Sequence, residues 1–347
     1  MLKKVRLKQG TLDWEKARES RIGSSEIFDI VRYYATDHEL QYCGFNSEDF
    51  RAEKPYTTVW ALYHKMIADG FYKREALAPE FAEYGHAVEP YGVYVLNKQR
   101  NKKIKPGSVY ADGRLIASLD AEGIAEKIDE VTFDYGEGTP KAGQRFVCEQ
   151  KSMLPGAVKK GLPYKYIIQA QYQIMQTGAD FFILQLMVLK EDSVFIRGKI
   201  CQMSRQTRIK YLDKNLMVKH LYFKNNVHLA KLIDKCLDLF FDDVENLREP
   251  KPFLEYDNSK NVIESIRLNT LYNDKLVLPF DLSEYLLAKD EEDKALKRRK
   301  DILQGIFEFA KEQNACRFHS EDGTIGTFAK DGSFRIRFPK EERSVLT

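Results

Sequence analysis

The sequence predicts a fold that combines α-helices and β-strands, of the α/β or α+β class. In residues 57–69 and 79–97, apolar side chains recur at the spacing of one helix face. Residues 145–151 and 181–189 are instead short apolar runs bounded by polar or turn-forming residues, which is typical of strands. With 43% hydrophobic residues, 21 Phe and 19 Tyr, the chain has ample material for a core.

The other elements are predicted from the same two patterns. The expected helices cover residues 14–18, a segment opening at Ser24 or Ser25, and residues 57–69, 79–97, 164–176, 204–224 and 228–247. The expected strands cover residues 109–110, 115–117, 124–133, 145–151, 181–189 and 194–201. Residues 36–55 are polar and irregular, so we interpret them as a loop or an insertion.

A domain boundary is expected shortly after the last of these helices. A chain of 347 residues can form one large domain, or a domain with an appendage. Residues 250–252, Pro-Lys-Pro, mark the boundary, and residues 255–261 resemble a linker. A long charged helix over 283–313 and a β-hairpin over 317–338 are expected beyond it. We therefore predict a first domain of residues 1–248 and a C-terminal extension of residues 249–347.

Charge and cysteine content restrict the class of protein. The net charge of +3 is too small to indicate a polyanionic partner by itself. Basic runs at residues 98–105 and 297–300 suit phosphate contacts, although a solvated face is the commoner explanation. Five scattered cysteines without a Cys-x-x-Cys motif favour a reducing cytoplasm and argue against a disulfide framework, a zinc site or an iron–sulfur cluster. We expect neither a signal peptide nor a membrane span.

The main candidate for chemistry is the strand of residues 145–151, which becomes polar at its end. Glu149 and Lys151 lie two residues apart, so they share one face of the strand, about 6.7 Å apart along the chain. A carboxylate beside an ammonium where a strand leaves the core can bind a divalent metal and polarise a reacting oxygen, as a phosphodiesterase requires. An isolated Glu-x-Lys is more often a solvated salt bridge, and the pattern recurs in polar surroundings at Glu249 and Glu292.

Other candidates each have a plainer alternative. Arg18 and Ser25 flank a helix start that could bind a phosphate, or could simply be capped. Glu89 has apolar neighbours in its helix, so it either meets a cation or points outward into a salt bridge. Asp120 ends a strand just before a turn, where Asp is usually a turn-former. Gln169 could orient a water or a phosphate, although glutamine on a solvated helix is the commoner case.

Taken in chain order, these residues form a series of spaced motifs. They are Trp14-x-x-x-Arg18 with Ser25-Glu26, Gly85-x-x-x-Glu89, Ser118-x-Asp120, Glu149-x-Lys151 and Gln169-x-Gln171. With this series, residues 10–230 resemble the lambda-type phage exonucleases, the YqaJ-like viral recombinase branch of the PD-(D/E)XK nucleases. The resemblance implies a restriction-endonuclease-like core, with a central mixed β-sheet flanked by helices and a C-terminal helix and hairpin as an appendage. Ala121 stands where many members have glycine, and 28 residues separate Asp120 from Glu149.

The resemblance also implies roles for individual residues. The expected ligands of Mg²⁺, with Mn²⁺ as a substitute, are Asp120, Glu149, the backbone carbonyl of Gln150, and Glu89. Lys151 would position or activate the attacking water, and Gln169 would orient that water or Lys151. The residues expected to hold the 5′ phosphate and the DNA are Arg18, Ser25 and Gln171.

The implied function is a processive 5′-to-3′ exonuclease of linear double-stranded DNA, which leaves a 3′ single-stranded overhang. The expected assembly is a homotrimer that works with a single-strand annealing recombinase in phage recombination, in the cytoplasm of a bacterial host. One alternative is another PD-(D/E)XK nuclease, acting as a structure-specific or single-strand endonuclease. The other is a non-catalytic DNA-binding or assembly module of the same fold.

Overall fold

The chain forms two compact units, Met1–Thr270 and Leu271–Thr347. The computed structural model describes residues 1–68, 79–99, 104–126, 131–153, 161–191, 193–253, 255–257, 259–269, 282–313, 316–319, 321, 324–328 and 334–337. The candidate site residues all lie in the first unit.

A five-stranded sheet forms the centre of the first unit. Its strand order is β3 (Lys105–Pro106), β6 (Ala121–Ile124), β7 (Arg145–Met153), β8 (Phe181–Leu189) and β9 (Leu216–Lys224). Strands β7 and β8 are parallel, whereas the other neighbours are antiparallel, so the sheet is mixed. Every residue of β8 is buried, as expected of a strand covered on both faces.

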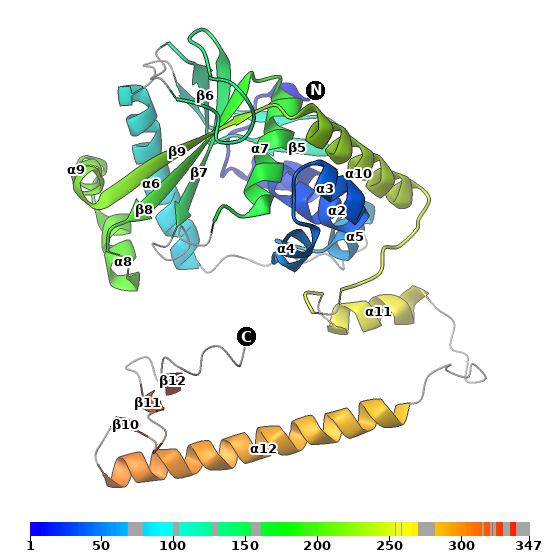
Figure 1. Ribbon diagram of the computed structural model, residues 1–347, viewed down its shortest axis with the longest axis vertical. Helices are drawn as coiled ribbons and strands as arrows, with labels where there is room; N and C mark the ends of the chain where they lie inside the picture. The colour runs from blue at the N-terminus through cyan, green and yellow to red at the C-terminus, as the bar shows by residue number, and fades with distance from the viewer. Residues whose placement is uncertain are drawn as a thin grey trace. The chain divides into compact units, whose positions relative to one another are not determined.

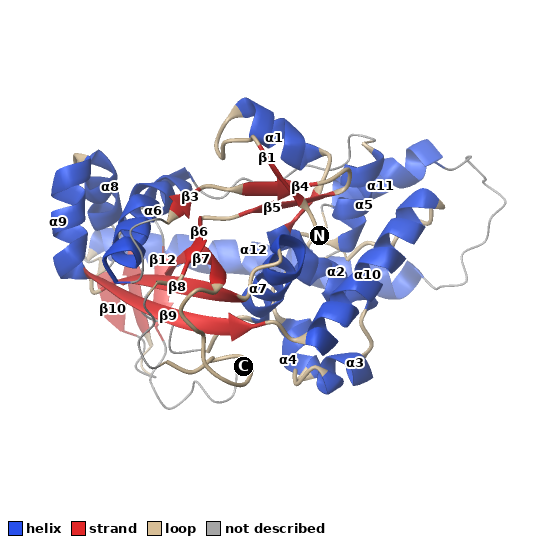
Figure 2. Ribbon diagram, turned by 90° about the horizontal axis from the view of Figure 1, so that it is seen from above, coloured by secondary structure: helices blue, strands red, loops and turns tan. Residues whose placement is uncertain are grey.

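Helices cover both faces of this sheet (Figures 1 and 2). Helix α7 (Tyr164–Thr177) packs on one face, where Phe182 and Leu184 of β8 join its core. Helix α6 (Pro79–Gln99) packs on the other, with Leu96 against Ile183. Because alternate residues of a strand point to opposite faces, the nine buried residues of β8, all apolar except Gln185, contribute to both layers. The predicted fold class, a mixed α and β fold with helices flanking a mixed sheet, is confirmed.

Further helices complete each layer. On the α7 side lie α2 (Ile27–Tyr34), α5 (Val59–Ile67) and α10 (Val227–Glu245). On the α6 side lie α8 (Val194–Gln202) and α9 (Arg205–Asn215), which share a cluster of buried side chains with α6.

A second, smaller sheet leads into the site. Its strand order is β1 (Lys3–Val5), β4 (Val109–Ala111), β5 (Leu115–Ser118) and β2 (Ile22–Gly23). Helix α1 (Leu12–Glu19) precedes β2, and a short 3₁₀ helix (Ser24–Glu26) follows it. Strand β2 pairs in parallel with β5, the strand that ends just before Asp120. The N-terminal turn is therefore attached to the segment that positions this carboxylate.

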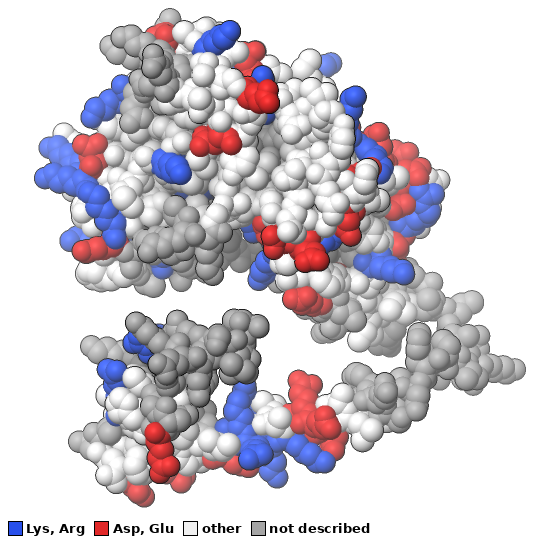
Figure 3. All heavy atoms as spheres, viewed as in Figure 1, with Lys and Arg blue, Asp and Glu red and all other residues white. Residues whose placement is uncertain are grey.

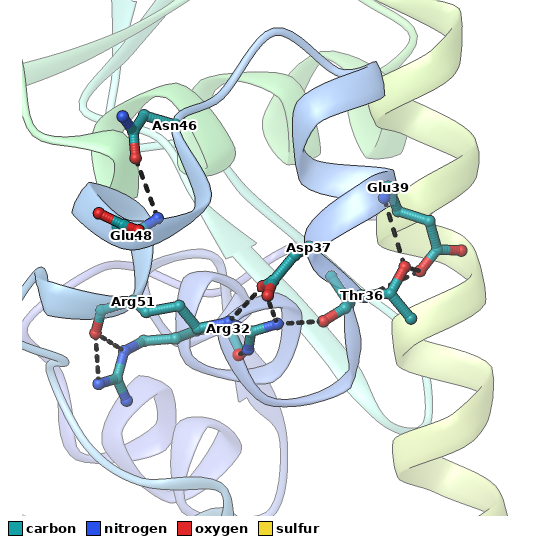
Figure 4. Close-up of polar contacts among 8 residues, drawn as sticks. Arg32, Thr36, Asp37, Glu39, Asn46, Glu48 and Arg51 are labelled. Atoms are coloured by element: carbon teal, nitrogen blue, oxygen red, sulfur yellow. Dashed lines mark hydrogen bonds and ion pairs between the residues drawn. The ribbon is translucent and has the colours of Figure 1, made fainter.

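The prediction of a loop over residues 36–55 is wrong, because two short helices form there (Figure 4). Helix α3 (Asp37–Tyr42) is capped by Thr36. The Thr36 hydroxyl accepts from the Glu39 amide, and the Glu39 carboxylate accepts from the Thr36 amide. Helix α4 (Ser47–Ala52) starts at Asn46, whose side chain accepts from two backbone amides. Such capping motifs stabilise helices that have little apolar periodicity.

Two other sequence-based assignments are also wrong. The strand expected over residues 194–201 is helix α8, which Ser193 caps by accepting a hydrogen bond from the Ile196 amide. The helix expected over residues 204–224 ends at Asn215, and its second half is strand β9. Pairing along the whole of β8 overrides the local helical pattern of this segment.

The first unit extends past the predicted boundary at residues 248 and 249. The Glu249 carboxylate accepts a hydrogen bond from the Trp60 indole at 2.6 Å and lies 3.1 Å from His64 Nε2. Farther on, Asp257 accepts from the Thr58 hydroxyl. These contacts with α5 and its N-cap tie the segment before helix α11 (Ser259–Asn269) to the first unit.

The second unit has one long helix and a small sheet. Helix α12 (Leu282–Glu312) is followed by β10 (Arg317–His319), β11 (Ile325–Phe328) and β12 (Phe334–Arg337). The three strands pair antiparallel in chain order, which extends the expected hairpin by one strand. The two Asp-Gly pairs between the strands, which begin at Asp322 and Asp331 and are turn signals in the sequence, lie outside the described residues. In the described part of the chain, no helix has the length and apolar character needed to cross a membrane.

Candidate active site

Strands β6 and β7 bring Asp120 and Glu149 together. In their antiparallel pairing Ala121 lies opposite Cys148, so Asp120, one residue before β6, lies beside Glu149. The backbone amide of Gln150 donates to Asp120 Oδ2 at 2.7 Å and fixes that carboxylate at the edge of the strand. Two acidic side chains from different parts of the sequence are thereby held side by side at one position of the sheet.

Lys151 lies directly against this pair. Its Nζ donates to Glu149 Oε1 at 2.8 Å, and it lies 5.4 Å from the centre of the Tyr166 ring. The side chains of Lys151 and Glu149 are 21% and 11% exposed, so solvent can reach the ammonium from one side. Glu149 and Lys151 therefore lie next to each other, as their spacing on a strand predicted.

The pKa values of Asp120 and Lys151 are set by burial and by the neighbouring charges. Burial raises the pKa of Asp120 well above its usual value, and the nearby negative charge of Glu149 adds to this, whereas Lys151 opposes it. For Lys151, burial works to lower the pKa, but the interactions with Glu149, Tyr56 and Asp120 together outweigh burial and the pKa is raised. Lys151 is therefore an ammonium at neutral pH. It can stabilise negative charge but is a poor proton acceptor.

Glu89 lies at the margin of this centre. Its carboxylate is 43% exposed and lies 3.4 Å from His86 Nδ1, one turn earlier in α6. Burial raises its pKa, and His86 acts in the opposite direction. Across the residues that the structure describes, no three His, Cys, Asp or Glu side chains are grouped so as to hold a metal ion. Asp120 and Glu149 are thus a pair of oxygen ligands, and the structure does not bring Glu89 into a three-carboxylate set with them.

Helix α7 covers the pair with glutamines. Gln173, fully buried, donates from Nε2 to Glu149 Oε2 at 3.0 Å. Gln169, one turn earlier and 4% exposed, has an Oε1 atom with no hydrogen-bond partner. Gln169 was expected at the centre from the sequence, whereas Gln173 was given no role there. The spacing of four residues, which puts both on one helix face, is the signal that could have found it.

Gln171 is turned to a different part of the structure. Its Nε2 donates to Asn225 Oδ1 at 2.6 Å, and its Oε1 accepts from the Asn226 amide at 2.8 Å. Asn226 is the N-cap of α10, so Gln171 joins α7 to the start of that helix. Both ends of its amide group are used in this structural link.

The other face of β7 has a buried polar row. Gln150 lies opposite Gln185 of β8, and Gln185 lies opposite His220 of β9, with 3.0 Å between Gln185 Nε2 and His220 Nε2. Neither amide atom of Gln150 has a hydrogen-bond partner. Gly92 of α6 lies over the row, and a Cβ there would be 2.3 Å from Gln150 Oε1 and 2.6 Å from Gln185 Oε1. The absence of a side chain at Gly92 is what lets α6 cover these amides.

Arg18 and Ser25 both lie near the turn at Gly23. The Arg18 guanidinium lies 4.7 Å from the Trp14 ring, whose Nε1 donates to Ser118 Oγ at 2.9 Å. A Cβ built on Gly23 would be 3.8 Å from Arg18 Nη2, which places the guanidinium at this turn. Ser25 is half-buried within the 3₁₀ helix. Through Trp14 and Ser118, the turn is linked to the strand that precedes Asp120.

A buried carboxylate closes the inner side of the same turn. Glu26 accepts from the Gly23 amide at 2.7 Å, and Gly23 is the N-cap residue in place of the serine expected from the sequence. Both of its oxygens also accept from Lys65 Nζ, at 2.8 and 2.7 Å. With both side chains under 10% exposed, the pair holds the turn rigidly against α5.

A cavity of about 1190 Å³ lies beyond the end of β7. Its lining joins Met153 of β7 to the start of α7, where the Glu53 carboxylate accepts from the Tyr164 and Lys165 amides. Lys54 and Lys224 also line it. Asp120, Glu149 and Lys151 are not among its described lining residues, so it neighbours the carboxylate pair and does not contain it.

Comparisons with known proteins give a distant structural likeness. Neither a scan against protein-family models nor a search of curated proteins finds a match. Among solved structures, the chain is similar to a phage related exonuclease from Haemophilus somnus 129PT, at 10% identity and a TM-score of 0.41, over 67% of this chain and 97% of that one. It is also similar to the alkaline exonuclease LHK-Exo from Laribacter hongkongensis, at 12% identity and a TM-score of 0.38, over 69% and 96% of the two chains. Similarity this distant assigns neither a family nor an activity.

The close approach at Gly92 can be tested by two matched substitutions in α6. Replacing glycine by alanine favours a helix by about 1 kcal/mol at either Gly85 or Gly92. A Cβ at Gly85 meets nothing within 4 Å, whereas one at Gly92 presses on Gln150 and Gln185. We therefore expect Gly92→Ala to be less stable than Gly85→Ala by about 1–3 kcal/mol in urea unfolding. Equal free energies of unfolding for the two variants would show that the polar row has room for a side chain.

Proposed function

We propose that this chain is a metal-dependent deoxyribonuclease, and specifically an exonuclease that digests linear double-stranded DNA from its 5′ ends and leaves a 3′ single-stranded overhang. The observation behind the proposal is the arrangement of Asp120, Glu149 and Lys151: two adjoining carboxylates from β6 and β7, with an ammonium held against one of them. The 5′-to-3′ direction and the processivity come from the sequence resemblance and are part of the proposal.

A divalent cation suits the carboxylate pair. Part of the rise in the Asp120 pKa comes from the neighbouring charge of Glu149, and a bound cation would relieve that repulsion. Oxygen ligands of this kind fit Mg²⁺, with Mn²⁺ as a substitute. Asp120 and Glu149 would hold the ion, with the Gln150 carbonyl and Glu89 as further proposed ligands. Once bound, it would lower the pKa of a water molecule and stabilise charge on the leaving oxygen.

The remaining residues of the centre would position the reacting groups. The Lys151 ammonium would offset the negative charge that builds up on the phosphate. Gln173 holds Glu149 in place from α7. The unpartnered Oε1 of Gln169 could accept a hydrogen bond from the attacking water. Arg18, with Ser25 at the Gly23 turn, would bind the terminal 5′ phosphate and so set the direction of digestion.

Access and assembly are also part of the proposal. The cavity beyond β7 is large enough for a nucleotide, and its lining has three lysines, Lys54, Lys165 and Lys224, against two acidic residues, Asp49 and Glu53. From the sequence resemblance, we propose a homotrimer that acts with a single-strand annealing recombinase in the cytoplasm of a phage-infected bacterium.

The decisive experiment is digestion of a linear duplex with a 5′ phosphate and one labelled strand, compared with a covalently closed circle, each with Mg²⁺ and with a chelator. We expect the 5′-phosphorylated strand to be converted to mononucleotides, in the presence of metal and on the linear DNA alone. Cutting of the circle would instead identify an endonuclease. No metal-dependent cutting of either substrate would favour a non-catalytic binding module.

Lys151→Ala should abolish cleavage and leave DNA binding in the presence of chelator largely unchanged. The reason is that the ammonium is proposed to act on the charge that develops during the reaction. Unaltered cleavage by this variant would remove Lys151 from the mechanism.

Gln173→Leu should lower the cleavage rate with little change in the KM for DNA. Removing a hydrogen bond to a charged group costs about 1.5–3 kcal/mol, which corresponds to roughly 10- to 100-fold in rate. Gln176→Leu is the matched control, because Gln176 is also buried on α7 and Glu149 takes its hydrogen bond from Gln173. Equal rates for the two variants would mean that Gln173 does not position Glu149 for catalysis.

A further inference from the structure

The buried ion pair between Glu26 and Lys65 lies at the turn that is proposed to bind the terminal phosphate. A Cβ built on Gly23 would be 3.6 Å from Glu26 Oε2 and 3.8 Å from Arg18 Nη2, so the carboxylate and the guanidinium both border this turn. Glu26 therefore places a negative charge beside the arginine that has to meet a phosphate. Without compensation, that charge would repel the phosphate and compete with it for the guanidinium.

Lys65 supplies the compensating charge. Its Nζ donates to both oxygens of Glu26, at 2.8 and 2.7 Å, and the side chains of Lys65 and Glu26 are 4% and 9% exposed. Salt screens a pair this buried only weakly, and removal of one partner leaves the charge of the other uncompensated. Arg18, Glu26 and Lys65 together have one positive charge, whereas Arg18 and Glu26 alone would have none.

A second carboxyl group increases the need for this cation. Asp29 is 3% exposed, and its oxygens accept from the Tyr56 and Thr57 amides, at 3.2 and 3.1 Å. Burial raises the pKa of Asp29 well above its usual value, and the negative charge of Glu26 adds to the rise. The two carboxyl groups thus lie close enough to repel each other. Loss of Lys65 would leave this acidic environment uncompensated beside the turn.

Helix α5 fixes the position of the lysine. The helix is capped by Thr58, whose hydroxyl accepts from a backbone amide of the first turn, and Lys65 lies in its last turn. The Glu249 carboxylate, which accepts from the Trp60 indole, holds the same helix from the far end of the unit's sequence. Because α5 is fixed in this way, the ion pair is already formed at the Gly23 turn before a ligand arrives.

We propose that Lys65 is a positioning residue for the terminal phosphate, and that it sets the preference for 5′ ends with a phosphate over 5′ ends with a hydroxyl. By compensating Glu26, it lets this carboxylate hold the Gly23 amide without cancelling the charge of Arg18. Figure 3 shows acidic and basic side chains interspersed on the face that it draws, and the net charge of the chain is only +3. Long-range attraction acts on both kinds of DNA end alike, so the difference between them comes from local charges. The inference rests on the 5′-phosphate site of the proposed function.

The test is binding of the full chain, in chelator, to two duplexes that differ only in a 5′ phosphate or a 5′ hydroxyl. The ratio of the two dissociation constants gives the phosphate preference, and a general loss of DNA affinity affects both duplexes alike. We expect Lys65→Met to lower this preference about tenfold, because it leaves a buried carboxylate unpaired beside the site. Lys235→Met is the matched control, since it removes a lysine that pairs with Glu39 between α10 and α3, and it should keep the preference.

A double variant separates charge from folding, because removal of one partner of a buried pair can also destabilise a protein. E26Q/K65M removes both charges, and glutamine can still accept from the Gly23 amide, so most of the preference should return. A merely structural role predicts no recovery, because the double variant lacks the ion pair altogether.

Three outcomes decide between the proposals. An unchanged preference in K65M, or a preference in E26Q/K65M as low as that of K65M, would overturn the role of Lys65. Equal binding of both duplexes by the unmodified protein would overturn it together with the 5′-phosphate site. A phosphate preference that depends on Lys65, in a protein without metal-dependent cleavage, would support this inference and refute the proposed nuclease.

Discussion

The candidate site depends on how strand β7 divides its side chains between two differently packed faces. Glu149 and Lys151 point to the layer of α7, and Gln150 points to the layer of α6. The backbone between them is also used, because the Gln150 amide fixes Asp120. A shift of the register by one residue would exchange the two faces and move Glu149 and Lys151 together away from Asp120 and from the glutamines of α7. Parallel pairing with the fully buried β8 along eight residues makes such a shift costly.

Burial and charge compensation explain why this centre is assembled from these residue types. Burial raises the pKa of Asp120, and the nearby negative charge of Glu149 adds to the rise, because two carboxylates and one ammonium leave the centre with a net negative charge. Gln173 stabilises Glu149 without adding charge, because an amide donor satisfies a carboxylate oxygen and remains neutral. A second cation at that position would compensate the carboxylates fully and reduce their attraction for an added ion. The neutral glutamine layer thus preserves the electrostatic need for a cation while protecting the carboxylates from unpaired burial.

Prediction from the sequence succeeded where a single local pattern of residues determines the secondary structure. Residues 181–189 could be assigned as a strand because every side chain except that of Gln185 is apolar, and Glu149 and Lys151 could be placed together because strand periodicity is fixed. Prediction failed where pairing or capping decided the outcome. Residues 216–224 were assigned to a helix but form a strand that pairs with β8. Residues 194–201 were assigned to a strand but form a helix whose N-terminus is capped by Ser193. The four-residue spacing puts Gln173 on the same helix face as Gln169, but its contact with Glu149 depends on the packing of α7 over β7, which the spacing alone does not show.

The distribution of charge over the surface of the C-terminal unit is another feature that a local sequence pattern does not predict. The run of basic residues at 297–300 is conspicuous in the sequence, yet it lies on an exposed helix that also bears acidic residues at 290–293. Arg317, Arg335 and Arg337 are separated by up to 20 positions and form no run, yet the register of β10, β11 and β12 places them on one face of the small sheet. The opposite face has phenylalanines, and the Phe307 ring of α12 lies 5.6 Å from the Phe328 ring. Like charges on a sheet therefore gather through strand alternation and register, which a search for runs of charge in the sequence does not reveal.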